Sequence, residues 1–325
     1  MYLFEEEAEM GELSKKIGEH GEKVVRNFIT MIGWSAAQDG VSIPCEHGGA
    51  HKIGNGDRNT HGIDLFHSVK SQLQDFTLDN IVISVKYTSK PYPNYPTSHF
   101  KSHFRDLAHT LECFMLSDFR TINNSDYEMS GIRASREIGV LFWLTNDSDA
   151  EQNVIKKIHN IVIEKGLSFS CIYVVDNERA KFIYDSISYI KRSYYEMDVN
   201  FHYAFTSSNY SDPQINKFGK VMPVEYLTSD ILPFRLIDKN SQKMSFCLSC
   251  KDGFSEEAMN RLIYLASDVS QNFTNSFVFL FPDYDPLKHQ TIVNRAVQLQ
   301  GDAGRSLDIN VYSFKNTFES LVHGK

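Results

Sequence analysis

The sequence predicts an α/β protein of two domains. Segments with the two-residue period of strands alternate with segments that have the period of amphipathic helices, which is typical of sheets covered by helices. Two neighbouring strand-like segments, 63–69 and 81–88, are close enough in sequence to pair as an antiparallel hairpin, so we expect a mixed first sheet. A polar stretch at 207–220 is typical of a linker. We therefore expect one domain in residues 11–206 and a second, βαβ-type α/β domain in residues 220–325.

The first domain should begin with a helix over residues 12–32, in which apolar side chains recur at helical spacing. Strand 81–88 alternates cleanly, with Ser84 and Lys86 on the face opposite its isoleucines. A proline-rich stretch follows, and a helix opens near Ser98. Farther along, the pattern predicts strands at 139–145, 168–175 and 201–206 and helices at 150–165 and 178–195.

The second domain lacks clustered acids, a glycine-rich phosphate loop and a nucleophile with a base nearby in sequence. We therefore expect residues 220–325 to act in association with a partner or with a second copy, rather than in catalysis. The pattern predicts strands near 221–226, 244–249, 276–281 and 309–314, with helices near 255–271 and 286–299.

The composition argues against a membrane-spanning or secreted protein. No stretch approaches the roughly 20 apolar residues of a membrane span, and the acidic N-terminus is unlike a targeting segment. Five cysteines, an odd number, favour a reducing compartment without disulfides, so we expect a cytoplasmic protein. The net charge of −8 argues against a surface coated in nucleic acid, yet residues 80–105 contain four basic residues and no acid. A local basic groove is therefore compatible with this charge.

The hairpin brings together two side chains that can do chemistry. A turn centred near Asp75 sets Asp64 opposite the segment from Ser84 to Lys86, so that a carboxylate and an ammonium share one face. A cross-strand salt bridge is one interpretation; the other is a hydrolytic metal site, which needs hard oxygen ligands and a cation near the reacting oxygen. Glu22 lies in the apolar stripe of the first helix by its spacing from Val25, Ile29 and Ile32. A carboxylate there must be compensated by a metal or a basic group; the alternative is a glutamate at the edge of the stripe that reaches solvent.

These elements resemble the restriction-endonuclease-like, or PD-(D/E)XK, nuclease superfamily, in which Holliday-junction resolvases also have a glutamate on the first helix. The residues that carry the resemblance are Gly18-Glu19-His20-Gly21-Glu22, Ile32-Gly33-Trp34, His61-Gly62-Ile63-Asp64 and Ile83-Ser84-Val85-Lys86-Tyr87. The resemblance implies that Glu22, Asp64 and the Val85 carbonyl bind Mg²⁺ or Mn²⁺, and that Lys86 positions or polarises the attacking water. The run from Val82 to Pro93 also resembles the nuclease subunit of a two-gene bacterial anti-phage defence system. That narrower resemblance implies a DNA substrate, a second subunit encoded by a neighbouring gene, and a homo- or hetero-oligomer.

One position departs from the superfamily motif. Ser84 stands where an Asp or Glu is expected, and the missing carboxylate weakens divalent binding. Ser84 could hold the metal through a water, or a carboxylate from elsewhere could replace the acid, Glu112 on the next helix being the best candidate. The same departure favours the alternative of a catalytically inactive nuclease fold that binds DNA or protein.

A basic run follows the presumed catalytic lysine. Lys90, Lys101 and Arg105, interleaved with tyrosines such as Tyr92, suit a surface that tracks phosphates, and tyrosine can stack on exposed bases. His61, three residues before Asp64, is expected to contact a phosphate. The alternative for the whole run is a solvated proline-rich loop.

The cysteines and histidines give weaker signals. Cys45, His47, His51 and His61 match no established zinc-finger spacing, and the Gly- and Asn-rich stretch at 48–59 is typical of a loop, so we do not expect zinc there. Cys247 and Cys250 fall within a strand and are interpreted as core residues.

Overall fold

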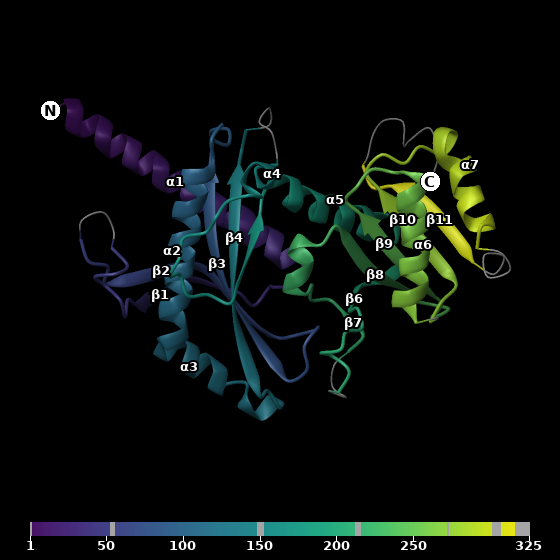
Figure 1. Ribbon diagram of the computed structural model, residues 1–325, viewed down its shortest axis with the longest axis horizontal. Coiled ribbons are helices and arrows are strands. Elements are labelled where there is room, and N and C mark those ends of the chain that lie inside the picture. The colour runs from purple at the N-terminus through teal and green to yellow at the C-terminus, as the bar shows by residue number, and fades with distance from the viewer. Residues whose placement is uncertain are drawn as a thin grey trace. The chain divides into compact units, whose positions relative to one another are not determined.

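The computed structural model describes residues 2–52, 56–147, 153–211, 216–271, 273–300 and 307–315. The chain forms two compact units, Met1–Ala180 and Lys181–Lys325 (Figure 1). The division falls within helix α5 (Asn177–Ser193), earlier than the polar stretch at 207–220. Strand β6 (Met197–His202), which the sequence analysis assigned to the first domain, pairs with a strand of the second sheet.

The first unit is built on a five-stranded mixed sheet in the order β1-β2-β3-β4-β5. Strands β1, β2 and β3 are antiparallel, whereas β3, β4 and β5 are parallel. The predicted α/β class with a mixed first sheet is confirmed. The strands are β1 (Gln38–Pro44), β2 (Thr60–Lys70), β3 (Thr77–Thr88), β4 (Ala134–Thr145) and β5 (Cys171–Val175).

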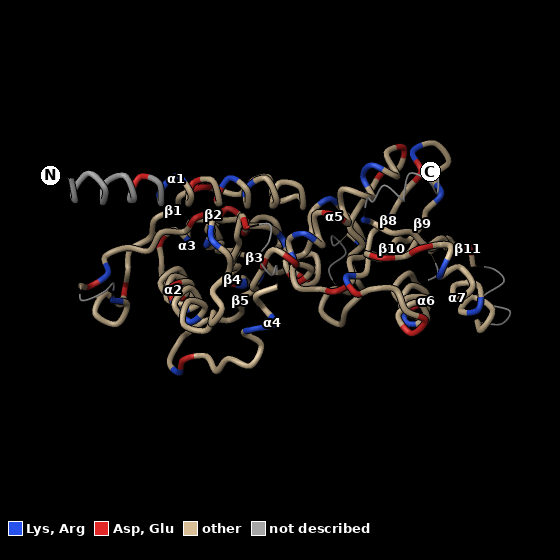
Figure 2. The backbone as a smooth tube through the Cα atoms, turned by 90° about the horizontal axis from the view of Figure 1, so that it is seen from above, with Lys and Arg blue, Asp and Glu red and all other residues tan. Residues whose placement is uncertain are grey.

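Helices cover both faces of this sheet, with α1 (Tyr2–Met31) on one side and α2 (Thr97–Leu116) on the other (Figure 2). On the α1 side, the Phe28 ring packs edge-on against Phe142 of β4 at a centroid distance of 5.6 Å. On the α2 side, Phe66 of β2 packs against Phe114 at 5.4 Å. Burial of these apolar faces holds the sheet between the two helices. The shorter helices of this unit are α3 (Asp118–Ser125), the 3₁₀ turn η1 (Glu128–Ser130) and α4 (Ile155–Ile158).

The second unit contains a six-stranded mixed sheet in the order β11-β10-β9-β8-β6-β7. Its βαβ units connect β9 to β10 and β10 to β11, which are parallel, and the other neighbours are antiparallel. The predicted second α/β domain type is therefore confirmed. Its elements are β7 (Phe218–Gly219), η2 (Val224–Thr228), β8 (Ile231–Asp238), β9 (Met244–Cys250), α6 (Glu256–Ser270), β10 (Ser276–Phe281), α7 (Pro286–Gln298) and β11 (Asp308–Ser313).

Two predicted elements are wrong in detail, and two strands were not predicted. The helix expected at 150–165 is reduced to α4 within the described residues, and the strand expected near 221–226 is the 3₁₀ helix η2, which begins after Pro223. Strands β1 and β8 escaped prediction because Gly40, with φ of +61°, and Pro233 interrupt their alternating patterns. In the described part of the chain, no helix is long and apolar enough to cross a membrane.

Candidate active site

Asp64 lies where strands β2 and β3 separate. Their paired residues run from Lys70 opposite Leu78 to Leu65 opposite Ile83, and Asp64 is the next residue along β2. Its Oδ2 accepts a hydrogen bond of 2.6 Å from the backbone N–H of Val85, and the Ser84 hydroxyl donates to the same carboxylate. The side chain thus binds a strand N–H that β2 leaves free, which fixes the carboxylate at the open end of the hairpin.

Lys86 meets a carboxylate that the sequence analysis missed. Its Nζ lies 3.5 Å from Oδ2 of Asp106, a residue of helix α2, and Arg58 Nη1 donates to the other oxygen of Asp106 at 2.7 Å. The Lys86 side chain is 30% exposed and that of Asp106 is 37% exposed, so this pair is accessible from solvent. Helix α2 therefore adds an acid to the face that already carries Asp64 and Lys86.

The charges of this group interact. Burial raises the pKa of the Asp64 carboxyl, and the negative charge of Asp106 raises it further, against the hydrogen bond from Val85 and the charge of Lys86. Burial alone would also raise the pKa of Asp106, but the hydrogen bond from Arg58 and the positive charge of Lys86 lower it. Two carboxylates and one ammonium are thus held close enough to influence one another. The salt-bridge interpretation of Asp64 and Lys86 is not realised as a direct contact, because the nearer partner of Lys86 is Asp106.

Glu22 lies at the edge of the apolar stripe of α1. Val25, Ile29 and Ile32 are fully buried, whereas Glu22 is exposed, so the expectation of a carboxylate within the stripe is wrong and the solvent-reaching alternative holds. The surrounding protein still removes part of its hydration, and this desolvation, followed by the negative charge of Asp64, raises the pKa of Glu22. The first-helix glutamate is therefore close enough to Asp64 for the two negative charges to interact.

A glycine sets the approach of α1 to the sheet. A Cβ on Gly21 would lie 2.3 Å from Cβ of Tyr87 on β3, which is too close for two non-bonded carbon atoms. The neighbouring His20 ring packs edge-on against Tyr87. The helix backbone thus crosses β3 one residue beyond Lys86, and Glu22 follows directly. The Gly-Glu pair on α1 brings the helix close enough for Glu22 to interact with Asp64.

We expect Gly21→Ala to lower the free energy of unfolding by about 1–3 kcal/mol, because the added methyl forces α1 away from β3. The matched control is Gly18→Ala, one turn earlier in the same helix, where a Cβ would meet nothing within 4 Å. The control should leave stability unchanged or raise it by up to about 1 kcal/mol, since alanine is the better helix former. Urea unfolding of both variants measures this, and equal effects would contradict the close crossing.

Of the residues expected to bind DNA, three lie on the surface of the first unit. Lys90 is exposed after the end of β3, Lys101 is partly exposed on α2, and Arg105 is exposed on the same helix. Arg105 Nε donates to Glu164 Oε2 at 2.6 Å, with both side chains about half exposed. An ion pair so accessible to water contributes little to the free energy of unfolding, so Arg105 can release Glu164 and bind a phosphate instead.

The other two are not accessible. The Tyr92 side chain is 6% exposed, and its hydroxyl donates to the carbonyl of Trp143 at 2.6 Å, with Asn177 Oδ1 at 2.7 Å. His61 is fully buried against Thr110 of α2. The prediction that Tyr92 and His61 contact DNA is therefore corrected, because both side chains face the interior.

Glu112 does not replace the acid missing at position 84. Its carboxylate is bonded to His51 Nε2 at 3.1 Å, in a different cluster. Asp106 is the residue of α2 that reaches Lys86, and a sequence signal for it exists. His103, Asp106, Thr110 and Cys113 form a polar stripe at helical spacing, beside the apolar stripe that packs on the sheet.

The donors at this end of the sheet fit a divalent cation. The charge of Asp64 acts on Glu22 and that of Asp106 acts on Asp64, and carboxylate oxygens are the hard ligands that Mg²⁺ and Mn²⁺ prefer. Burial and, to a smaller extent, a neighbouring negative charge raise the pKa of both Glu22 and Asp64, and the charge of a bound cation would oppose this shift. The carbonyl of Val85 is the further expected ligand, and the N–H of the same residue donates a hydrogen bond to Asp64.

Residues 10–179 match the family model described as the PD-(D/E)XK nuclease domain of the GAPS4 protein. The match covers just over half of the chain and spans most of α1, all five strands of the first sheet and helix α2. Glu22, Asp64, Lys86 and Asp106 all fall within it. No curated protein and no solved structure matches the chain.

Proposed function

The chain belongs to the family of GAPS4 PD-(D/E)XK nuclease domains, and from this premise we propose that it is a divalent-metal-dependent deoxyribonuclease that hydrolyses phosphodiester bonds. The observation that carries the proposal is the meeting of Asp64, Lys86 and Asp106 at the open end of the β2–β3 hairpin. Asp106 supplies the second carboxylate of the site in place of an acid at Ser84. This extends the motif across two elements, because one acid comes from the hairpin and the other from α2.

Each residue has a distinct task in this proposal. A bound Mg²⁺ or Mn²⁺ would activate water and neutralise charge on the phosphoryl oxygens. Asp64, whose carboxylate is fixed by the Val85 N–H, would hold the ion, and Glu22, Asp106 and the Val85 carbonyl would be further ligands. Lys86, held by Asp106, places its ammonium where it orients the attacking water and stabilises the developing negative charge.

The substrate is DNA, bound along the basic surface of Lys90, Lys101 and Arg105. Lys90 comes shortly after Lys86 in the sequence, and Lys101 and Arg105 lie on helix α2, the helix that also carries Asp106. Contacts of this kind track phosphates and position the duplex without reading its sequence. The surface therefore contributes affinity, and the chemistry stays with the carboxylates and Lys86.

The family match supports a role in anti-phage defence, and the resemblance from Val82 to Pro93 adds a second subunit encoded by a neighbouring gene. We assign residues 220–325, which lie in the second unit, to association with that subunit or with another copy of the chain. Its parallel strands carry a buried aromatic core, and none of the carboxylates of the proposed site come from it.

An inactive nuclease fold that binds DNA or protein is the second candidate, and Ser84 is the observation that favours it. The serine hydroxyl donates to Asp64, which gives that carboxylate a partner in the absence of any metal. The two candidates differ in whether metal binding and cleavage accompany DNA binding.

Cleavage assays with the purified chain, with and without the neighbouring gene's product, test the proposal on linear and circular DNA. We expect cleavage with Mg²⁺ or Mn²⁺, none with EDTA, and none in Asp64→Asn, whose fold should persist because the amide retains an oxygen to accept from Val85. Thermal unfolding with and without Mn²⁺ provides a second measurement. A wild type that does not cleave, and that is as indifferent to Mn²⁺ as Asp64→Asn, would leave the inactive binding module.

A further inference from the structure

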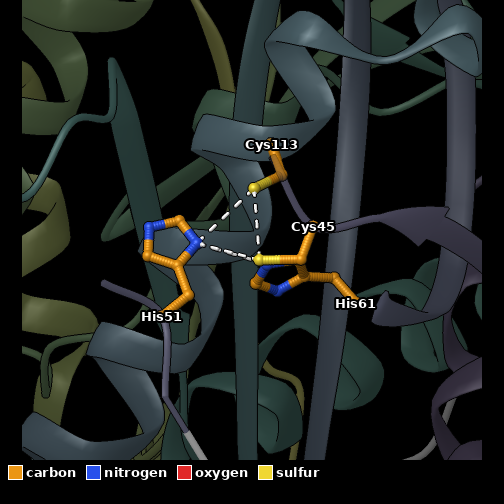
Figure 3. A group of neighbouring side chains, drawn as sticks. All are labelled: Cys45, His51, His61 and Cys113. Carbon is orange, nitrogen blue, oxygen red and sulfur yellow. Dashed lines mark hydrogen bonds between the residues drawn. The ribbon is translucent and has the colours of Figure 1, made fainter. Parts of the chain in front are cut away.

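A second cluster of possible metal ligands lies apart from the carboxylates. Cys45 directly follows β1, His51 lies in the turn after it, His61 is on β2, and Cys113 is on α2 (Figure 3). One ligand atom from each lies within 4.8 Å of every other, and His51, His61 and Cys113 are buried. Residues far apart in the sequence thus present two sulfurs and two nitrogens to one point.

The distances match the edges of a zinc tetrahedron. Zn–S bonds of about 2.3 Å and Zn–N bonds of about 2.0–2.1 Å give edges of about 3.8 Å between sulfurs, 3.6 Å between sulfur and nitrogen, and 3.3 Å between nitrogens. The two sulfurs are 4.0 Å apart. His51 Nδ1 lies 3.6 Å from Cys45 Sγ, 3.5 Å from Cys113 Sγ and 3.3 Å from His61 Nε2. Four measured edges therefore agree with a single central ion.

The outer hydrogen bonds orient both imidazoles toward that centre. The Thr110 hydroxyl donates its one proton to the carbonyl of Asp106 at 2.8 Å, so it accepts from His61 Nδ1 at 3.2 Å. His51 Nε2 donates to the Glu112 carboxylate at 3.1 Å. These bonds leave His61 Nε2 and His51 Nδ1 with lone pairs, which face each other at 3.3 Å. Two lone pairs at this distance repel unless a cation lies between them. Metal-bound histidines typically donate their other ring N–H to a protein acceptor, as His61 does to Thr110 and His51 does to Glu112.

The Cys113 sulfur accepts a hydrogen bond from the backbone. The backbone N–H of Glu46 donates to Cys113 Sγ at 3.4 Å, which stabilises negative charge on that sulfur. Two thiolates with two imidazoles select Zn²⁺ over the hard cations expected at the carboxylate site. Four protein ligands also complete a tetrahedron and leave no open position for a reacting group.

We propose that Cys45, His51, His61 and Cys113 bind a structural Zn²⁺ ion. No zinc was expected, because Cys45, His47, His51 and His61 match no established finger spacing and residues 48–59 are typical of a loop. The cluster instead includes Cys113 of helix α2 in place of His47. The ion would tie the segment after β1 and strand β2 to α2. It would also support the proposed active site, because Thr110 bonds both to the ligand His61 and to the backbone of Asp106.

Metal analysis of the full-length protein, purified under reducing conditions without chelator, tests the proposal. We expect about one Zn²⁺ per chain in the wild type and in Asp64→Asn, and about a tenfold loss in Cys113→Ser and His51→Ala. Cys171→Ser is the matched control, since this cysteine is partly exposed and outside the cluster, and it should retain the zinc.

Cobalt gives a measurement that does not depend on variants folding. Wild-type protein stripped of zinc and supplied with Co²⁺ should develop the intense visible bands of a tetrahedral ion with thiolate ligands. Substoichiometric zinc in the wild type, equal zinc in Cys113→Ser, or cobalt spectra without thiolate bands would each overturn the proposal. So would thiol titration that finds a Cys45–Cys113 disulfide in freshly purified protein.

Discussion

Replacing Lys86 by alanine should slow DNA cleavage by about 10²–10⁴-fold while leaving DNA affinity nearly unchanged. Its ammonium lies beside Asp106, and its positive charge opposes the burial that raises the pKa of Asp64, so it acts at the reacting centre. The contribution of one lysine to phosphate binding is small where Lys90, Lys101 and Arg105 provide other contacts. Single-turnover cleavage with Mg²⁺, together with DNA binding measured without added Mg²⁺, separates the two effects.

Lys243→Ala is the control for the loss of one positive charge. This lysine is exposed at the start of β9 in the second unit, and its replacement should change neither cleavage nor affinity. Lys86→Ala should also unfold at nearly the wild-type temperature, because a part-exposed ion pair contributes little to stability. A variant that cleaves at the wild-type rate would remove Lys86 from the catalytic group.

The hairpin part of the site was predictable because its geometry is local. Side chains alternate along a strand, so a turn near Asp75 determines which residues of β3 lie opposite Asp64. The structure places Asp64 against Val85 and Ser84 as this reasoning predicts. The first-helix glutamate was predictable in position but not in burial, since the edge of an apolar stripe can face protein or solvent.

The contributions of α2 were not predictable in the same way. Whether Asp106 or Glu112 reaches Lys86 depends on how the helix is rotated when it packs on the sheet, and the two residues lie six positions apart. The same docking brings Cys113 to Cys45, 68 residues away in sequence. Tyr92 was assigned to the phosphate-tracking surface because it is interleaved with the basic residues that follow Lys86, yet its hydroxyl donates to the Trp143 carbonyl and the ring is buried. Each of these contacts depends on long-range packing.

Replacing Asp106 by asparagine should reduce cleavage by at least about 100-fold, because the charge stabilisation that a metal supplies is worth several kcal/mol and each 1.4 kcal/mol is tenfold in rate. The amide keeps the size of the side chain but removes the negative charge beside Asp64. If Asp106 is the second carboxylate of the site, the variant should also need a higher Mg²⁺ concentration for half-maximal cleavage. Asp126→Asn, an exposed acid at the end of α3, controls for the charge change and should cleave normally.

A carboxylate introduced at position 84 of β3 tests whether Asp106 binds the metal or only positions Lys86. Ser84 donates to Asp64, so an aspartate at position 84 would lie beside it, at the motif's usual place for the second acid. We expect the double variant Asp106→Asn/Ser84→Asp to recover cleavage and the wild-type Mg²⁺ requirement, at least in part. Loss of activity in Asp106→Asn with an unchanged Mg²⁺ requirement, and no recovery in the double variant, would mean that Asp106 positions Lys86 and does not bind the metal. Normal cleavage by Asp106→Asn would contradict both roles and leave the site with the carboxylates of Asp64 and Glu22.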